Sequence, residues 1–150
     1  MKLEAYIDGG SRGNPGEAGL GVYMPNFVRI AEFLGVQTNN YAEYSALVCA
    51  VRCAVLCRCD ELKVFADSEL VVKQILGEYK VRNEGIRPLH DSAQRWIALI
   101  PKFSIQHVRR EMNKEADKLA NLAMDKRRNS VKWETNGPRT SQPESANLFD

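Results

Sequence analysis

The stretch Lys2-Leu3-Glu4-Ala5-Tyr6-Ile7-Asp8, followed by the glycine-rich segment Gly9–Gly16, decides the fold of this chain. Apolar and polar side chains alternate from residue 2 to residue 7, with Leu3 and Ile7 on one side, which predicts a half-buried β-strand. Asp8 ends this strand and opens the turn. Turns favour Asp for their own geometric reasons, so a single acid at this position is ordinary. It becomes informative because three other acids stand in comparable places.

Glu43 lies at the start of a predicted helix, Asp67 ends the apolar run 62–66, and Asp117 lies in the last predicted helix. Taken singly, they are explained as a helix N-terminal charge, a solvated strand end and an exposed helical residue. In open α/β sheets, however, ligands gather at the carboxyl ends of the strands. Four carboxylates brought together there would repel one another unless protons or cations intervened, and oxygen ligands suit Mg²⁺. The positions therefore predict a carboxylate site for hard divalent metals.

Strand and helix patterns alternate along the rest of the chain. Strands are predicted over residues 2–8, 20–24, 28–34, 62–66 and 103–108, and helices over residues 40–57, 68–76, 88–100 and 113–128. We expect Asn39 or Asn40 to cap the first helix, and Ser68 and Asn113 to cap the second and the last. This order predicts an α/β protein with a five-stranded mixed sheet flanked by helices, whose first, fourth and fifth strands are parallel.

Composition gives the domain organisation. The 150 residues, 44% hydrophobic and 27% charged, fit one soluble domain over residues 1–128. From residue 129 onward Ser, Thr, Asn, Pro and Gln dominate, which predicts a flexible polar tail over 129–150. No apolar run approaches the ~20 residues of a membrane span, so we expect a cytoplasmic protein that does not contact membranes. Nothing in the sequence indicates an obligate protein partner, and a monomer is expected.

Four cysteines fall within one short segment: Cys49, Cys53, Cys57 and Cys59. The first three are spaced by four and line one side of a helix, where they can pack as small apolar residues, bind a metal or form a redox pair. Helical cysteines at this spacing rarely have disulfide geometry, and the segment contains no Cys-x-x-Cys pair for zinc. Core packing is the favoured interpretation.

Four segments in this order resemble ribonuclease H of type 1: Asp8–Gly16, Thr38–Tyr44, Ala66–Val72 and His107–Asp117. The resemblance covers roughly residues 1–124, and four motifs in register are far more specific than any one of them. It implies the ribonuclease H-like fold, with sheet order 3-2-1-4-5. It also implies endonucleolytic hydrolysis of the RNA strand of RNA–DNA hybrids, which leaves 5′-phosphate and 3′-hydroxyl ends.

For the acids, the resemblance implies a catalytic site with two Mg²⁺ ions, for which Mn²⁺ can substitute. Asp8 would bridge both ions, Glu43 and Asp67 would complete one, and Asp117 would complete the other. Two such ions can activate water, neutralise the phosphate and stabilise the leaving oxygen.

The resemblance gives His107 a role in proton transfer or product release, because a histidine precedes the last aspartate by ten residues in relatives. A strand-end histidine that only packs or caps is the simpler alternative. Val108-Arg109-Arg110 follows His107 here instead of a glycine-rich loop. Glu111 is a rival for the same proton-transfer task.

The resemblance also assigns residues to the RNA–DNA hybrid: Gly10, Ser11, Asn14, Thr38, Asn39, Asn40, Glu69 and Asn83. Amides and backbone groups suit this task because they can hydrogen-bond 2′-hydroxyls across a shallow minor groove. Two features depart from the family. Glu69 stands where relatives often have Gln, and the basic helical handle of some relatives is missing between residues 77 and 87. Lys80, Arg82, Asn83 and Arg87 can supply a reduced substitute.

Two other functions remain as alternatives. One is another enzyme of the same superfamily, such as a DNA transposase, resolvase or exonuclease, against which the Asn14 and Asn39-Asn40 amides argue. The other is a catalytically silent domain that binds hybrids, which the loss of one carboxylate would favour. All four carboxylates are present.

Overall fold

The computed structural model describes residues 1–134 of the chain. Its strands are β1 (Lys2–Arg12), β2 (Gly16–Met24), β3 (Val28–Gln37), β4 (Glu61–Ala66), β5 (Lys102–His107) and β6 (Ser130–Trp133). Its helices are α1 (Asn39–Leu56), α2 (Glu69–Ile75), α3 (Arg87–Ile97), the short 3-10 helix η1 (Arg110–Met112) and α4 (Lys114–Lys126).

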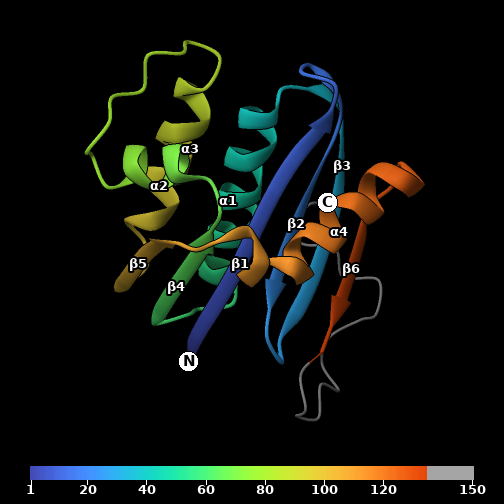
Figure 1. Cartoon of the computed structure of the whole chain (residues 1–150). Helices are drawn as coiled ribbons and strands as arrows, with labels where there is room; N and C mark the ends of the chain where they lie inside the picture. The colour runs from blue at the N-terminus through green and yellow to red at the C-terminus, as the bar shows by residue number, and fades with distance from the viewer. Residues whose placement is uncertain (135–150) are drawn as a thin grey trace.

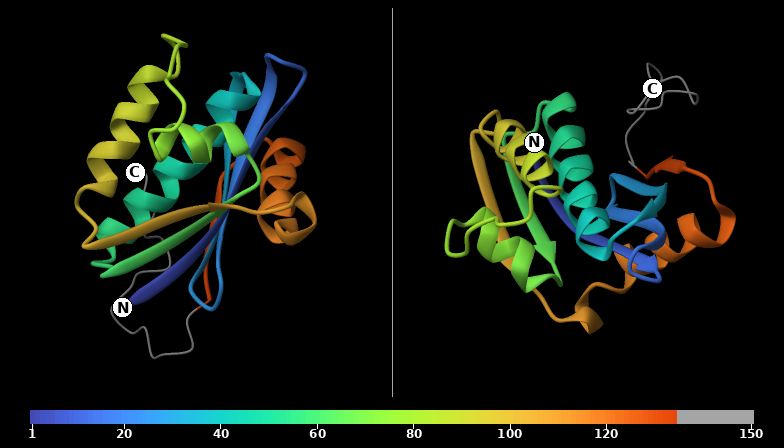
Figure 2. Two further views of the ribbon diagram at one scale, coloured as in Figure 1. Left: turned by 60° about the vertical axis from the view of Figure 1, so that its left-hand side comes forward. Right: turned by 90° about the horizontal axis from the view of Figure 1, so that it is seen from above.

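One mixed sheet forms the centre of the molecule, with the strand order β5-β4-β1-β2-β3-β6 (Figure 1). β1, β4 and β5 run parallel, and the other neighbouring pairs are antiparallel. Helices α1, α2 and α3 lie on one face, and α4 lies on the other (Figure 2). The predicted α/β class, the order of the first five strands and their parallel members are confirmed.

The main hydrophobic core lies between the sheet and α1. Leu3, Ala5 and Ile7 of β1 are buried in it, as the alternating pattern predicts, while Lys2 and Glu4 on the opposite side are exposed. Cys49, Cys53 and Cys59 are also buried in this core, and none of the four cysteines, all of which are described, forms a disulfide. The packing interpretation of the cysteines is confirmed. No helix among residues 1–134 is long and apolar enough to span a membrane.

A sixth strand was not expected, and it corrects the boundary predicted at residue 128. Residues 130–133 pair antiparallel with β3 and extend the sheet. Trp133 packs edge-on against Phe27, with ring centroids 5.5 Å apart, and Glu134 forms an ion pair with Arg29. The polar composition of the tail gives no local signal for this strand, because the strand is held by pairing and contacts with residues about 100 positions earlier in the chain. The rest of the predicted tail, residues 135–150, lies outside the described residues.

A chain of residues 1–128 is therefore expected to unfold at a lower temperature than a chain of residues 1–134. The longer form keeps the Phe27–Trp133 contact and the strand pairing, and burial of part of one aromatic side chain stabilises a fold by about 1–3 kcal/mol. Thermal unfolding followed by circular dichroism should show a difference of several degrees. Equal melting temperatures would mean that β6 contributes nothing to stability.

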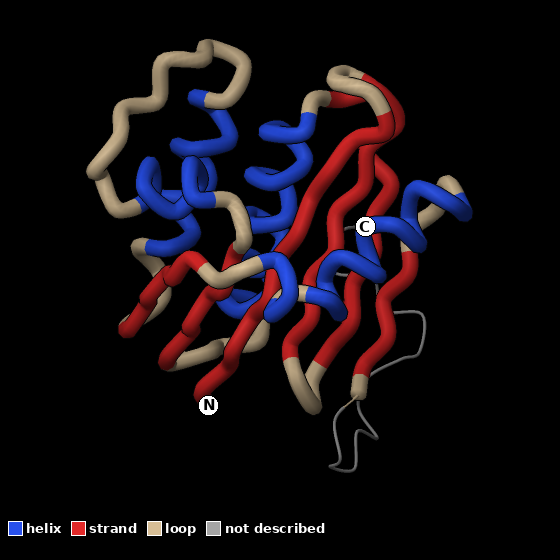
Figure 3. The backbone as a smooth tube through the Cα atoms, viewed as in Figure 1, coloured by secondary structure: helices blue, strands red, loops and turns tan. Residues whose placement is uncertain are grey.

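The helix ends are set by local hydrogen bonds. Thr38 caps α1, because its Oγ1 accepts from the Tyr41 N–H at 3.1 Å, so the prediction of Asn39 or Asn40 as the cap is wrong by one residue. Ser68 caps α2 as predicted, and Gly77 follows that helix with φ +82°. A loop without a helix joins α2 to α3, visible at the upper left of Figure 3. The basic handle is thus absent from the structure as well as from the sequence.

Candidate active site

Three carboxylates converge at the carboxyl end of β4, where its pairing with β1 ends. Asp67 directly follows β4, and Glu43 reaches the same place from α1. Asp8 lies within β1, which continues to Arg12 because Gly9–Arg12 pair with β2, so the prediction that Asp8 ends the strand is wrong. A carboxylate oxygen from each lies within 4.8 Å of the other two. The predicted gathering of Asp8, Glu43 and Asp67 is therefore found in the structure.

A glycine beside Asp8 allows α1 to reach this position. A Cβ atom on Gly9 would lie 2.3 Å from the carbonyl carbon of Ala42 and 2.5 Å from the backbone nitrogen of Glu43. The backbones of β1 and α1 therefore touch at this point, which any other residue type would prevent. Because Asp8 and Glu43 each adjoin the contact, it brings their side chains to one site.

A second glycine, on the neighbouring strand β2, brings α4 to the sheet from the opposite face. Gly21 of β2 pairs with Asp8, and a Cβ atom on it would lie 2.1 Å from the carbonyl oxygen of Ala116. Asp117 is the next residue of α4, and its side chain hydrogen-bonds that of Asp8. The fourth predicted carboxylate thus joins the cluster, although it lies outside the tight group of three.

Burial and mutual repulsion change the acidity of this cluster. The pKa of Asp8 is raised to about 8, first by burial and then by the neighbouring charge of Asp67 and the contact with Asp117. Burial also raises the pKa of Glu43 to about 7, with a further contribution from Asp67. Hydrogen bonding from Ser68 and the charge of Arg110 act in the opposite direction on Glu43. These carboxylate oxygens fit a divalent cation. Side by side and buried, the carboxyl groups ionise with difficulty, and a cation bound between them would stabilise their ionised forms.

The carboxylates open into a cleft of about 450 Å³. Residues from β1, the starts of α1 and α4, and η1 line it, among them Gly10, Ser11, Asn39, Arg110 and Asn121. Such a polar trough across a sheet end can admit an extended polyanion more readily than a small apolar ligand.

Two residues at this cleft were missed by the sequence analysis as site residues. Arg110 lines the cleft and acts electrostatically on Glu43. Asn121 donates from Nδ2 to Oδ1 of Asp117 at 3.3 Å, and its own Oδ1 accepts from Arg12 at 3.1 Å. The available signals were the Arg109-Arg110 pair inside the last motif and the i,i+4 helical spacing from Asp117 to Asn121.

Comparison with known proteins agrees with this architecture. The family model described as "Reverse transcriptase-like" matches residues 7–123. Ribonuclease HI of Halobacterium salinarum is 36% identical over 129 residues, which cover 83% of this chain and 65% of that protein. Ribonuclease H of Ruthia magnifica is 32% identical, with 83% of this chain and 97% of that protein covered. The chain belongs to the ribonuclease H family.

Solved structures of ribonucleases H superpose closely on this one. The crystal structure of RNase H1 from Halobacterium salinarum has a TM-score of 0.77 at 34% identity and covers 84% of this chain and 99% of that chain. LC11-RNase H1, solved in complex with an RNA/DNA hybrid, has a TM-score of 0.78 at 34% identity, with coverages of 83% and 98%. Some relatives are longer: the chain spans 65% of the Halobacterium protein and 36% of a bifunctional protein of Mycobacterium tuberculosis.

Several residues expected to contact substrate form one exposed cluster in this ribonuclease H domain. The Asn39 side-chain oxygen accepts from the backbone N–H of Ser11 at 2.7 Å and from its hydroxyl at 3.1 Å. The Asn14 side-chain oxygen accepts from the backbone N–H of Asn39 at 3.1 Å. These bonds join the β1–β2 hairpin to the start of α1. They use the amide oxygens, and among residues 1–134 no acceptor pairs with the amide NH₂ groups of Asn14 and Asn39.

The other expected substrate residues lie in different settings. Thr38 caps α1, and the Oδ1 atom of Asn40 is buried without a hydrogen-bond donor among the described residues. Glu69 pairs with Lys73 at 2.8 Å, which lowers its pKa. Asn83 lies in the loop before α3, where its side-chain oxygen accepts from Gly85 N–H at 2.8 Å. The structure therefore brings Ser11, Asn14 and Asn39 together, while Asn83 is held within its own loop.

His107 lies at the end of β5, opposite Ala66 in the parallel register and therefore one residue from Asp67. Its side chain is exposed and does not line the carboxylate cleft. Glu111, its rival for proton transfer, lies in η1 and lines a separate hollow with Tyr6 and Met112. Both remain candidates for assisting the reaction, with His107 adjoining the strand end that presents Asp67.

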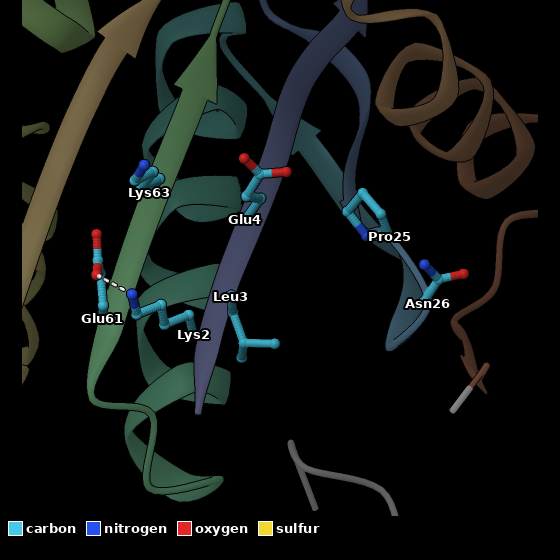
Figure 4. A pocket seen from close by; sticks show the side chains of 7 residues that line it. All are labelled: Lys2, Leu3, Glu4, Pro25, Asn26, Glu61 and Lys63. Atoms are coloured by element: carbon cyan, nitrogen blue, oxygen red, sulfur yellow. Dashed lines mark ion pairs between the residues drawn. The ribbon is translucent and has the colours of Figure 1, made fainter. Parts of the chain in front are cut away.

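A further hollow of about 370 Å³ lies at the opposite end of the sheet, at the starts of β1 and β4 (Figure 4). Lys2 and Glu61 form an ion pair across it, and Glu4, Lys63 and Asn26 lie around its rim. Its charges are of both signs, and Lys2, Glu4 and Lys63 are exposed, so they offer no convergent site for one kind of ion. It is a surface hollow between strand ends, remote from the carboxylates.

Proposed function

We propose that this chain hydrolyses the RNA strand of RNA–DNA hybrids as a metal-dependent endoribonuclease. The observation that carries the proposal is the convergence of Asp8, Glu43 and Asp67, with Asp117 hydrogen-bonded to Asp8. Membership of the ribonuclease H family and the likeness to a relative solved with an RNA/DNA hybrid support the choice of substrate. The products would carry 5′-phosphate and 3′-hydroxyl ends.

The four carboxylates would hold two Mg²⁺ ions, or Mn²⁺ in their place. Asp8, Glu43 and Asp67 would form one site, and Asp8 with Asp117 the other. Bound ions of this kind supply an activated water and neutralise charge on a phosphodiester. The chain's own contribution is to hold the ligands: Ser68 hydrogen-bonds Glu43, and Asn121 hydrogen-bonds Asp117.

The cluster of Ser11, Asn14 and Asn39 would read the RNA strand. Ser11 and Asn39 of this cluster line the cleft that contains the carboxylates, and 2′-hydroxyls in a minor groove accept bonds from amide donors. Arg110 in the same cleft would bind a backbone phosphate. We further propose that the protein acts as a monomer in the cytoplasm.

The deciding experiment incubates the protein with labelled RNA–DNA hybrid, RNA duplex and DNA duplex, with Mg²⁺ and with EDTA. Cleavage of the RNA strand of the hybrid alone, abolished by EDTA, is the expected result. Cutting of the DNA duplex would favour a transposase- or exonuclease-like activity. Hybrid binding without cleavage would identify a silent binding domain.

A second pair of substrates tests how the RNA strand is read. Duplex DNA containing four consecutive ribonucleotides should be cut well, and duplex DNA containing one should be cut poorly, because the amide cluster would contact several 2′-hydroxyls. Equal rates on both would contradict the proposed role of Asn14 and Asn39 while leaving the carboxylate site intact.

Replacement of His107 by alanine should slow turnover by roughly 10- to 100-fold, because a positioned acid–base group assists the reaction to about this extent. Single-turnover rates at saturating hybrid and Mg²⁺ would measure the effect, with Glu111→Gln measured in parallel. An unchanged rate for His107→Ala with a slow Glu111→Gln would transfer the role to Glu111.

A further inference from the structure

Asn113 stands at the start of α4 and is only 1% exposed. An asparagine at this position normally caps the helix with its side-chain oxygen. Here the side chain makes no cap bond, although the residue occupies the cap position. Instead, Nδ2 donates to the carbonyl oxygen of Ile7 in β1 at 2.8 Å. The expectation that Asn113 caps the last helix is therefore only half correct, because its amide is directed at the sheet.

Fold stability does not account for this arrangement. The Oδ1 atom of Asn113 is buried and accepts no hydrogen bond from any residue between 1 and 134. A buried acceptor without a donor costs about 1–3 kcal/mol, and the missing helix cap costs about 1 kcal/mol more. An apolar side chain of similar shape would avoid the first of these costs. The one hydrogen bond that this side chain makes among residues 1–134 is the one to Ile7.

That bond joins the two parts of the chain that carry Asp8 and Asp117. Ile7 is the last residue of β1 paired with β4, and Asp8 follows it directly. On the other side, the carbonyl oxygen of Asn113 accepts from the backbone N–H of Asp117 at 3.1 Å. Two consecutive hydrogen bonds through one buried residue thus connect the backbone next to Asp8 with the backbone of Asp117.

We propose that Asn113 is a positioning residue that fixes Asp117 against Asp8 and so sets the affinity of this pair for a divalent cation. The proposal rests on the proposed function insofar as the cation is the one used in hydrolysis. Asp8, Glu43 and Asp67 are held by β1, α1 and β4, and do not depend on Asn113. Asp117 lies on α4 at the other face of the sheet, where the close approach of Ala116 to Gly21 and the bond from Asn113 to Ile7 hold the start of the helix.

Asn113→Leu is the main test variant, because leucine has a similar shape, cannot donate to the Ile7 carbonyl and lacks the unpaired Oδ1 acceptor. Its Mg²⁺ concentration for half-maximal hybrid cleavage should rise about 10- to 100-fold, the usual effect of losing a residue that orients a metal ligand. The KM for hybrid at saturating Mg²⁺ should stay unchanged. Asn113→Ala should show the same metal dependence if the leucine variant does not fold.

A readout independent of activity is the rise in melting temperature on adding Mg²⁺ or Mn²⁺. At equal metal concentration, the rise should be smaller in Asn113→Leu than in the wild type, because weaker binding stabilises the fold less. Val28→Ala, a fully buried change in β3, is the control for general destabilisation. It should lower the melting temperature while keeping the wild-type metal dependence.

A double-mutant cycle with Asp117→Asn decides whether Asn113 acts through Asp117. In the Asp117→Asn background, Asn113→Leu should have little further effect on metal binding. The metal concentration that gives half of the rise in melting temperature should change by less than about twofold. Full additivity of the two changes, or a wild-type metal response in Asn113→Leu, would overturn the proposal. If the wild type binds Mg²⁺ by this measurement but cuts no hybrid, the proposed function is wrong. The double-mutant cycle then still tests the positioning role of Asn113 independently.

Discussion

Asp8→Asn is expected to reduce hybrid cleavage in Mg²⁺ by at least about 100-fold, because Asp8 contacts both Asp67 and Asp117 in the cluster and would ligate both ions. Hybrid binding in Ca²⁺ or EDTA should stay near that of the wild type, since asparagine keeps the shape of the side chain. Cleavage rates at saturating hybrid, together with binding measured by fluorescence anisotropy, separate the two effects. Glu4→Gln, an exposed acid on the same strand, is the matched control and should cut normally.

The same substitution should make the metal-free fold more stable. The pKa of Asp8 is raised to about 8 in the folded protein, so the folded state resists ionisation of a group that ionises near pH 4 when unfolded. The contribution of Asp8 to the free energy of unfolding is therefore complete below about pH 4, and it is lost as the pH rises toward 8. Asparagine cannot ionise, so the variant should gain on the order of 2 kcal/mol at pH 8 in EDTA, or roughly 5 °C in melting temperature.

Two results would contradict this account of Asp8. Retention of more than a few per cent of wild-type cleavage in Mg²⁺ would exclude a ligand shared by both ions. A variant that melts below the wild type at pH 8 in EDTA would mean that the cluster is not electrostatically strained. Addition of Mg²⁺ should stabilise the wild type and have much less effect on Asp8→Asn, because the cation relieves a repulsion that the variant no longer has.

Gly9→Ala is expected to lower the melting temperature by on the order of 10 °C, because the new methyl group would lie 2.3 Å from the backbone of Ala42. Backbone atoms cannot rotate away as a side chain can, so α1 must move off β1. This displacement should separate Glu43 from Asp8 and weaken Mg²⁺ binding in the protein that still folds. Differential scanning calorimetry with and without Mg²⁺ measures both losses.

The neighbouring residue provides a sharp control for this prediction. A Cβ atom on Gly10 would meet only the side-chain oxygen of Asn39, at 3.8 Å, which is an ordinary contact. Gly10→Ala should therefore keep a melting temperature within a few degrees of the wild type. Similar losses in the two variants would mean that glycine is needed at both positions for backbone flexibility, and the proposed helix–strand contact would not explain Gly9.

Much of the fold follows from local pattern. The alternation in Lys2–Ile7 predicts β1 and its buried side, Ser68 is confirmed as the cap of α2, and Pro25-Asn26 lies in the turn between β2 and β3. The failures occur where a distant contact outweighs local composition. Ser130–Trp133 reads as polar tail, yet contact with Phe27 and Arg29 holds it on β3 as a strand.

The identity of the four acids could be read from the sequence because Asp8 ends an alternating run, Asp67 follows a strand, and Glu43 and Asp117 lie near helix starts. The sequence also predicted that they converge, but not how closely, since their spacing depends on Gly9 and Gly21 letting helices from opposite faces touch the backbone of the sheet. The same holds for Asn113, whose sequence position indicates a helix cap and whose amide instead bonds β1. The sequence determined which residues can carry the chemistry. Tertiary packing decided their distances and acidities, because burial and charge repulsion act through space between residues far apart in the chain.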